Sequence, residues 1–161
     1  MFRVALLLLV AACSGSPGGP AQLNKIDQPT TQTLAHDPVE SADILDREPV
    51  ANAARIKHIL IGWNQVGNDG RTDPRAAKRT QKDAQDLIHA LVEQIKQGAD
   101  FDALMKKYSE DPGSASSARV YDVSPEAQLV IEFKQLGLRL RMNEVGVVKS
   151  EYGYHIMKRV E

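Results

Sequence analysis

Two short apolar segments near the end of the chain restrict the fold more than any other feature of the sequence. Residues 145–149 and 154–160 are rich in strand-favouring side chains, and only residues 150–153 separate them. A parallel connection between two strands needs about a dozen residues or more, whereas an antiparallel hairpin needs only a few. The sequence therefore predicts a hairpin here and excludes a wholly parallel sheet.

Two further strands are expected upstream of the hairpin. In residues 55–61 the side chains of Ile56, His58 and Leu60 fall on one face, and Ile59 and Ile61 fall on the other. Residues 119–123 form the remaining strand.

Helical spacing is typical of the segments between these strands. Apolar residues recur at the helical period over residues 84–95, and Gly98 follows as a stop signal. Asp100 is the expected cap of a second, short helix, and residues 109–117 are turn-rich. A further helix is expected over residues 124–137, begun by a Ser-Pro pair. The order β-α-α-(turn)-β-α-β-β predicts an α+β fold, with a four-stranded antiparallel sheet and helices on its faces.

The first residues have the pattern of a secretory signal. Arg3 is followed by nine apolar residues and then by Cys13, the only cysteine. That apolar stretch is far shorter than the roughly 20 residues that span a bilayer. The residues before Cys13, Val-Ala-Ala, resemble the lipobox of bacterial lipoproteins, in which the cysteine receives the lipid. A conventional secretory signal with a coincidental cysteine is the alternative.

The lipoprotein interpretation divides the chain into three parts. Residues 1–12 are the expected signal peptide, residues 13–54 a flexible tether that is dispensable for folding, and residues 55–161 the folded domain. The implied place is the bacterial cell envelope, where the lipid on Cys13 anchors the chain to a membrane. Ser14 gives no acidic retention signal of the kind that some lipoproteins carry, which favours an outer membrane, with the domain facing the periplasm.

Charge and cysteine content exclude several classes of function. The chain has 20 lysines and arginines against 21 aspartates and glutamates, so nothing in its charge favours a nucleic acid as partner. A single cysteine excludes an internal disulfide and any zinc site with several cysteines, and we expect no metal.

Two of the four histidines occupy unusual positions. His36 falls in the expected tether and His89 on the polar side of the long helix, so both are interpreted as solvated. His58 and His155 each lie inside an apolar strand. Such a histidine is either a satisfied core residue or a functional one, and residue composition alone leaves both alternatives open.

Three segments, taken in order, carry a family resemblance. They are Arg-Ile-Lys-His-Ile-Leu-Ile over residues 55–61, Gly-Ala-Asp-Phe-Asp-Ala-Leu with Tyr-Ser-Glu-Asp over residues 98–111, and Glu-Val-Gly-Val-Val-Lys-Ser-Glu-Tyr-Gly-Tyr-His-Ile over residues 144–156. Together they resemble the first strand, the second helix with its following turn, and the closing hairpin of the parvulin-type peptidyl-prolyl cis/trans isomerases.

The resemblance implies four catalytic positions. His58 and His155 match the two histidines that lie beneath the bound proline, and Ser150 matches the hydroxyl group with which they share hydrogen bonds. Asp111 matches the position that faces the peptide carbonyl group, although it could equally be a helix or turn cap.

The same resemblance implies the residues that hold the proline ring. Leu129 and Phe133 match these positions, and at a separation of four on one helix they share a face. Plain core packing is the alternative for both. In addition, the glycine-rich run that members carry before this helix is replaced by residues 117–122, which contain no glycine. Glycine in such a run permits a positive φ.

Three functions remain open at this point. The retained His58, Ser150 and His155 favour an isomerase that acts on proline-containing, unfolded or extended polypeptides and needs no cofactor. The missing glycine run favours a catalytically weak chaperone, or a binding module for extended chains. A structural lipoprotein that only docks a partner is the third alternative.

Overall fold

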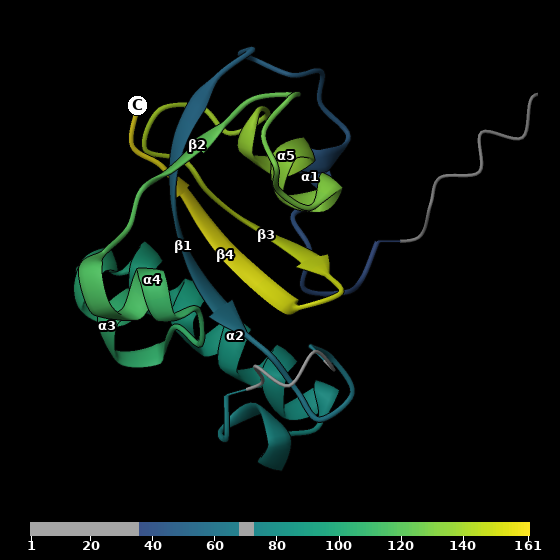
Figure 1. Cartoon of the computed structure of the whole chain (residues 1–161), viewed down its shortest axis with the longest axis vertical. Coiled ribbons are helices and arrows are strands. Elements are labelled where there is room, and N and C mark those ends of the chain that lie inside the picture. Colours follow the sequence, from purple (N-terminus) through teal and green to yellow (C-terminus); the bar gives the residue numbers. More distant parts are fainter. Residues whose placement is uncertain (1–35, 68–72) are drawn as a thin grey trace, which may run out of the picture. The chain divides into compact units, whose positions relative to one another are not determined.

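The computed structural model describes residues 36–67 and 73–161 (Figure 1). The expected signal peptide, Cys13 and the tether up to residue 35 lie outside the described residues. The elements in chain order are α1 (Ala42–Leu45), β1 (Ala54–Ile61), the 3-10 turn η1 (Ala76–Lys78), α2 (Gln81–Lys96), α3 (Phe101–Tyr108), α4 (Pro112–Ser117), β2 (Tyr121–Val123), α5 (Ile131–Gly137), β3 (Val145–Ser150) and β4 (Gly153–Arg159).

A four-stranded sheet in the order β2-β1-β4-β3 forms the centre of the fold, and every neighbouring pair is antiparallel. The predicted α+β class is confirmed. The predicted hairpin is β3–β4, and its register places Ser150 opposite Gly153. The strand β1 lies between β2 and β4, so the first strand of the fold pairs with the last (Figure 1).

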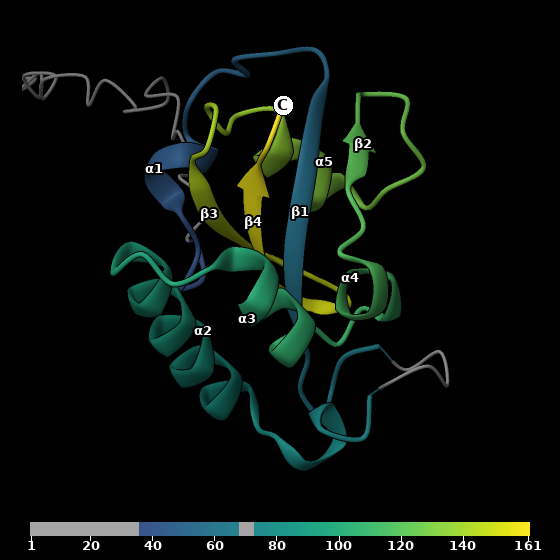
Figure 2. The ribbon, with the colours of Figure 1, turned by 90° about the vertical axis from the view of Figure 1, so that its left-hand side faces the viewer.

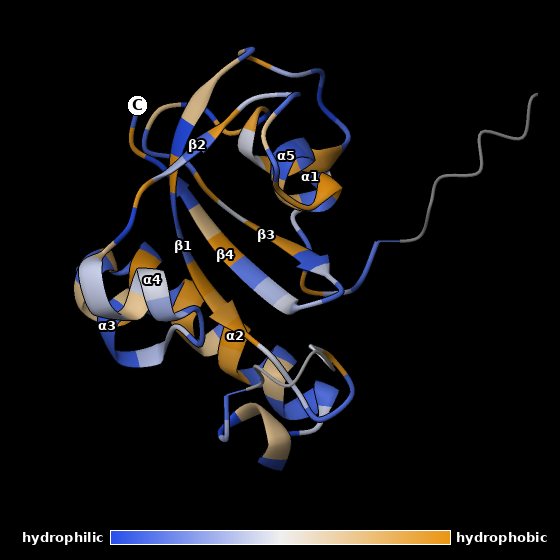
Figure 3. Ribbon diagram, in the orientation of Figure 1, coloured by the Kyte–Doolittle hydropathy of each residue, from blue (hydrophilic) through white to orange (hydrophobic). Residues whose placement is uncertain are grey.

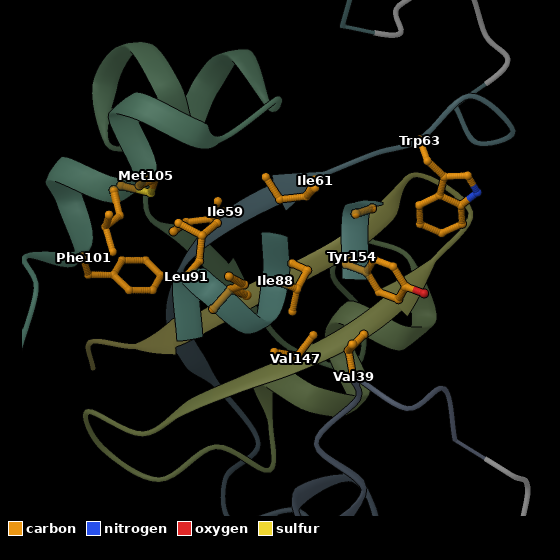
Figure 4. Close-up of a cluster of buried hydrophobic side chains, with 13 residues drawn as sticks. Val39, Ile59, Ile61, Trp63, Ile88, Leu91, Phe101, Met105, Val147 and Tyr154 are labelled. Carbon is orange, nitrogen blue, oxygen red and sulfur yellow. The ribbon is translucent and has the colours of Figure 1, made fainter. Parts of the chain in front are cut away.

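Each face of the sheet buries its own hydrophobic core. The first core joins Ile59, Ile61 and Ile156 to Leu91 of α2 and Phe101 of α3 (Figure 4). Since side chains alternate along a strand, the neighbouring positions reach the opposite face. In Figure 2, α3 lies in front of the sheet and α5 behind it.

The second core lies on the opposite face, against α5. It joins Ile56 and Met157 of the sheet to Phe133 and Leu136 of α5 and to Ile44 of α1. The alternation predicted for residues 55–61 is therefore correct. The hydrophobic colour at the C-terminal end of β1 in Figure 3 reflects its run of apolar residues, Ile59 to Ile61.

Two local predictions need correction. The turn-rich residues 109–117 contain the helix α4, because Asp111 caps it and Pro112 occupies its first turn. The helix expected from residue 124 begins only at Ile131. Residues 124–129 form turns instead, in which the Ala127 amide donates to the Ser124 carbonyl. Residues 125–128 offer no apolar stripe that a longer helix could bury.

The expected boundary at residue 55 is too late, because the preceding residues pack on the domain. We call residues 37–45 the edge strap. Ser41 donates its amide to the Val147 carbonyl at 2.9 Å, and the Val147 amide returns a hydrogen bond to Ser41 Oγ at 2.9 Å. Val39 enters the first core and Ile44 the second. The strap thus supplies the outer edge of β3 with hydrogen-bond partners that a free edge would lack.

Within residues 36–67 and 73–161, no helix combines the length and the apolar character that crossing a membrane requires.

Candidate active site

The two strand histidines meet on the face of the sheet that α5 covers. His58 of β1 and His155 of β4 project from neighbouring strands, and their Nδ1 atoms lie 3.1 Å apart. Both side chains are buried, and the rings are stacked with an interplanar angle of 27°. Residue composition alone left the role of these histidines open, and the family resemblance implied a shared site; the structure brings them into direct contact.

Ser150 lies at one end of this pair. Its Oγ is 2.7 Å from Nε2 of His155, and the Tyr152 amide donates to the same Oγ at 3.1 Å. The hairpin explains the contact, because Ser150 ends β3 and His155 follows closely on β4. The predicted neighbour of the histidines is therefore in place.

Asp111 lies at the other end. Its Oδ2 is 3.4 Å from Nε2 of His58, and it accepts the Ser114 amide and the Tyr121 hydroxyl at 2.8 Å each. The bond from Ser114 is the N-terminal cap of α4. Both interpretations of Asp111 are thus compatible, because one oxygen atom caps the helix and faces the histidine.

The contacts favour one order of protons along this row of groups. An ionised Asp111 can only accept, so we place a proton on Nε2 of His58, whose Nδ1 then accepts. Nδ1 of His155 donates to it, which leaves Nε2 of His155 to accept from the Ser150 hydroxyl. Each donor in the row therefore points toward Asp111, and each imidazole carries a single proton.

The electrostatics agree with this assignment. Burial, together with the neighbouring His58, holds the pKa of His155 well below its usual value, so this ring stays neutral. Burial alone would raise the pKa of Asp111, but hydrogen bonds from His58, Ser114 and Tyr121 lower it well below the usual range. Burial and the Asp111 carboxylate raise the pKa of Tyr121 to about 12.

An apolar groove of about 280 Å³ opens above the histidines. Phe133 lines the groove and makes edge-on contacts to both imidazoles, at ring-centre distances of 5.1 Å to His58 and 5.5 Å to His155. Leu129 also lines the groove, although it precedes α5 and does not share a helix with Phe133. Both predicted residues thus line one groove, but only Phe133 does so from the helix.

Tyr121 and Tyr152 also line the groove, although neither is predicted from the sequence. Tyr121 packs edge-on against His58 at 5.0 Å and donates to Asp111. The register of the short strand β2 places Tyr121 opposite Ile56 and thus on the face of His58. An alternating pattern over three residues is too short to reveal that register.

The segment that lacks glycine still adopts the backbone conformation that glycine favours. Ala118 ends α4 with φ 51° and ψ 40°, in the left-handed region. This conformation ends the helix and directs the chain toward β2 and Tyr121. An alanine there retains the turn but is strained by about 1–2 kcal/mol.

Comparison with known proteins identifies the family. Residues 42–161 match the family model described as the PPIC-type PPIase domain. The chain belongs to the parvulin family. The site described above lies wholly within the matched parvulin domain.

The relatives of this parvulin domain are longer proteins, and the similarity covers only a part of each. The foldase protein PrsA of Geobacillus kaustophilus is 42% identical over 65 residues, which are 40% of this chain and 23% of PrsA. The chaperone SurA of Pseudomonas aeruginosa is 32% identical over 111 residues, which are 68% of this chain and 24% of SurA. The chain thus spans about a quarter of the length of these relatives.

Solved structures share the parvulin fold. The peptidyl-prolyl isomerase ESS1 from Candida albicans superposes with a TM-score of 0.59 at 21% identity, over 68% of this chain and 63% of that one. The peptidylprolyl isomerase PrsA from Bacillus cereus gives a TM-score of 0.51 at 28% identity, over 74% of this chain and 38% of that one.

The described part of the parvulin domain contains no cluster of side chains that could bind a metal ion. Nowhere in residues 36–67 and 73–161 do three or more His, Cys, Asp or Glu side chains gather in a group that could hold an ion.

Proposed function

We propose that this parvulin domain catalyses cis/trans exchange at X-Pro bonds in unfolded or extended polypeptides. The observation that carries the proposal is the row from Ser150 through His155 and His58 to Asp111, directly beneath an apolar groove. In the proposed complex the proline ring lies against Phe133 and Leu129, above the imidazoles.

The reaction needs no bond to be broken. Its barrier of about 18–20 kcal/mol comes from the conjugation of the amide, and uncatalysed exchange takes tens to hundreds of seconds. A catalyst need only bind the twisted amide more tightly than either planar form. A rigid apolar groove that holds the ring, while the peptide carbonyl group rotates, provides such a preference.

Asp111 has a specific electrostatic role in this proposal. The carbonyl oxygen of a planar amide carries negative charge that conjugation places there, and this charge diminishes as the C–N bond twists. A carboxylate beside that oxygen therefore destabilises the planar forms more than the twisted form, which lowers the barrier. The lowered pKa of Asp111 keeps the carboxylate ionised for this role.

The test is the exchange rate of a short peptide with one proline, measured by NMR exchange spectroscopy. We expect the wild-type protein to accelerate exchange and Asp111→Asn to lose about tenfold or more of that acceleration. Asparagine is also a good helix cap, so α4 is retained. The matched control is Asp100→Asn, which makes the same change at the cap of α3, outside the groove. An Asp111→Asn variant with the wild-type rate would contradict the role of the carboxylate.

A second candidate function is the holding of extended chains without useful turnover. Tyr121 favours it, because its ring lies at the groove and contacts both His58 and Phe133. The name of the relative SurA, a chaperone, points the same way. Suppressed aggregation of an unfolded protein, combined with background exchange of the proline peptide, would establish this function instead.

We further propose that the domain works in the bacterial cell envelope, tethered by lipid on Cys13 and facing the periplasm from the outer membrane. The support is the sequence around Cys13, with small residues directly before the only cysteine. Two or more acyl chains anchor a protein firmly, whereas one chain binds marginally. Cys13→Ser should release the protein from membranes or leave it unprocessed. A variant that is still cleaved and membrane-bound at the wild-type level would refute the anchor.

A further inference from the structure

The edge strap binds the β3–β4 hairpin through hydrogen bonds and an ion pair, on the face opposite the candidate active site. Asp37 Oδ2 accepts the Tyr154 hydroxyl at 2.8 Å and lies 3.2 Å from Nζ of Lys149. Gln81 and Gln85 of α2 donate to its two carboxylate oxygens at 3.3 and 3.2 Å. The Asp37 side chain is only 10% exposed, so strap, helix and both strands of the hairpin enclose it.

The backbone of β3 is held by the same strap. Glu40 Oε1 accepts the Lys149 amide at 2.8 Å, and Ser41 exchanges two hydrogen bonds with Val147. β3 therefore has partners on both edges, β4 on one side and the strap on the other. The last residues of an edge strand fray readily when the outer side is unpaired.

The residues that Asp37 holds are the sequence neighbours of two site residues. Lys149 and Tyr154 face each other across the hairpin, and they directly precede Ser150 and His155. Because successive side chains of a strand point to opposite faces, holding the first pair from behind orients the second pair toward the groove.

We propose that Asp37 is a positioning residue for the active site: it fixes the hairpin so that Ser150 Oγ stays 2.7 Å from Nε2 of His155. The Ser150 contact determines which nitrogen of His155 carries the proton, and therefore whether His155 can donate to His58. Asp37 thus influences the positions of the protons in the row through the hairpin, without contacting any residue of the row itself. Only the kinetic part of the test rests on the proposed isomerase function.

The experiment compares the wild-type chain with Asp37→Ala. Long-range ¹H–¹⁵N NMR at neutral pH reports the tautomer of His155 directly. The wild type should show a protonated Nδ1 and an unprotonated Nε2, whereas Asp37→Ala should show signals averaged between the two tautomers. For the proline peptide, we expect kcat to fall about three- to tenfold, as for other residues that act through a hydrogen-bond network. KM should change less than about twofold, because no groove contact is removed.

Two further variants separate positioning from mere stability. Asp43→Asn alters a carboxylate of the same strap whose side chain is 77% exposed, so it should leave the His155 signals and kcat unchanged. Tyr154→Phe keeps the buried ring and removes only the hydroxyl bound to Asp37, so it should reproduce the effect of Asp37→Ala on the His155 signals.

The readouts overturn the two proposals separately. If Asp37→Ala and Tyr154→Phe lower Tm while the His155 signals and kcat stay at wild-type values, Asp37 is a structural residue only. If the wild-type protein shows no exchange, the proposed isomerase function fails, and the His155 signals still decide the role of Asp37.

Discussion

The Tyr121 hydroxyl lies 2.8 Å from Oδ2 of Asp111, the same oxygen that faces His58 at 3.4 Å. The Tyr121 ring meanwhile packs edge-on against His58 and Phe133, at 5.0 and 5.8 Å. One side chain therefore links the charged end of the site to its apolar groove. Its outer face carries the guanidinium group of Arg119 at 4.7 Å.

Tyr121→Phe should remove the hydrogen bond to Asp111 and keep the aromatic ring at the groove. Loss of the hydroxyl removes one of the hydrogen bonds that lower the pKa of Asp111, so this pKa should rise toward its ordinary value. A ¹³C NMR titration of the Asp111 carboxyl group measures the shift. Stability should fall by about 1.5–3 kcal/mol, as for a hydrogen bond to a charged group. Tyr108→Phe is the control, and an unchanged Asp111 titration in Tyr121→Phe would refute the link.

His155 should make stability fall as the solution becomes mildly acidic. Its pKa is lowered in the folded state from 6.5, so below that pH the unfolded chain binds a proton that the folded chain resists. The contribution of the neutral His155 to the free energy of unfolding is therefore fully present above about pH 6.5. Below that pH the free energy of unfolding decreases, by at most about 1.4 kcal/mol per pH unit. Denaturant unfolding measured from about pH 5 to about pH 8, the range in which histidine titrates, checks this slope.

Variants of two histidines identify the source of that slope. His155→Gln should abolish it, whereas His89→Gln, at an exposed position on α2, should retain it. A slope that survives in His155→Gln would assign the proton uptake to another group.

Removal of the edge strap should destabilise the domain. A chain that begins at Ala54 loses the buried Val39 and Ile44 and the hydrogen bonds along β3. Burying one such side chain contributes about 1.5–3 kcal/mol, so the loss of both should reach about 3–6 kcal/mol. Thermal unfolding should show a Tm lower by more than about 10 °C than that of a chain beginning at His36. Equal Tm values would show that the strap contributes nothing to stability.

Ala118→Gly should stabilise the protein, because glycine relieves the positive φ at the end of α4. We expect a gain of about 0.5–1 kcal/mol in the free energy of unfolding. Ala115→Gly is the matched control, since it places the same change inside α4 and should destabilise by about 1 kcal/mol. A loss of stability in Ala118→Gly would mean that flexibility of the unfolded chain outweighs the strain.

The sequence was sufficient for the sheet and for the histidine pair. His58 and His155 lie in apolar strands, and the family resemblance places these strands in one sheet; their contact follows from the pairing of β1 with β4. The edge strap escaped detection because only Val39 and Ile44 enter the cores, and two residues make no period. Its remaining contacts are polar, with β3, with Tyr154 of β4 and with two glutamines of α2, and they leave no hydrophobic pattern.

Tyr121 escaped detection for another reason. Its role depends on the register of a three-residue strand and on a left-handed turn at Ala118. An alanine gives no signal of such a turn, whereas a glycine would have suggested it.

Under the proposed function, the edge strap also restricts where an extended client chain can bind. Unfolded polypeptides readily add a strand to any sheet whose edge is unpaired, and a bound client of that kind would be sequestered rather than released. At one border of this sheet the strap already occupies the backbone groups of Val147 and Lys149, and at the other β2 is only three residues long. Under the proposed function, the domain thereby keeps its own sheet edges out of reach of an extended client and leaves that client the groove.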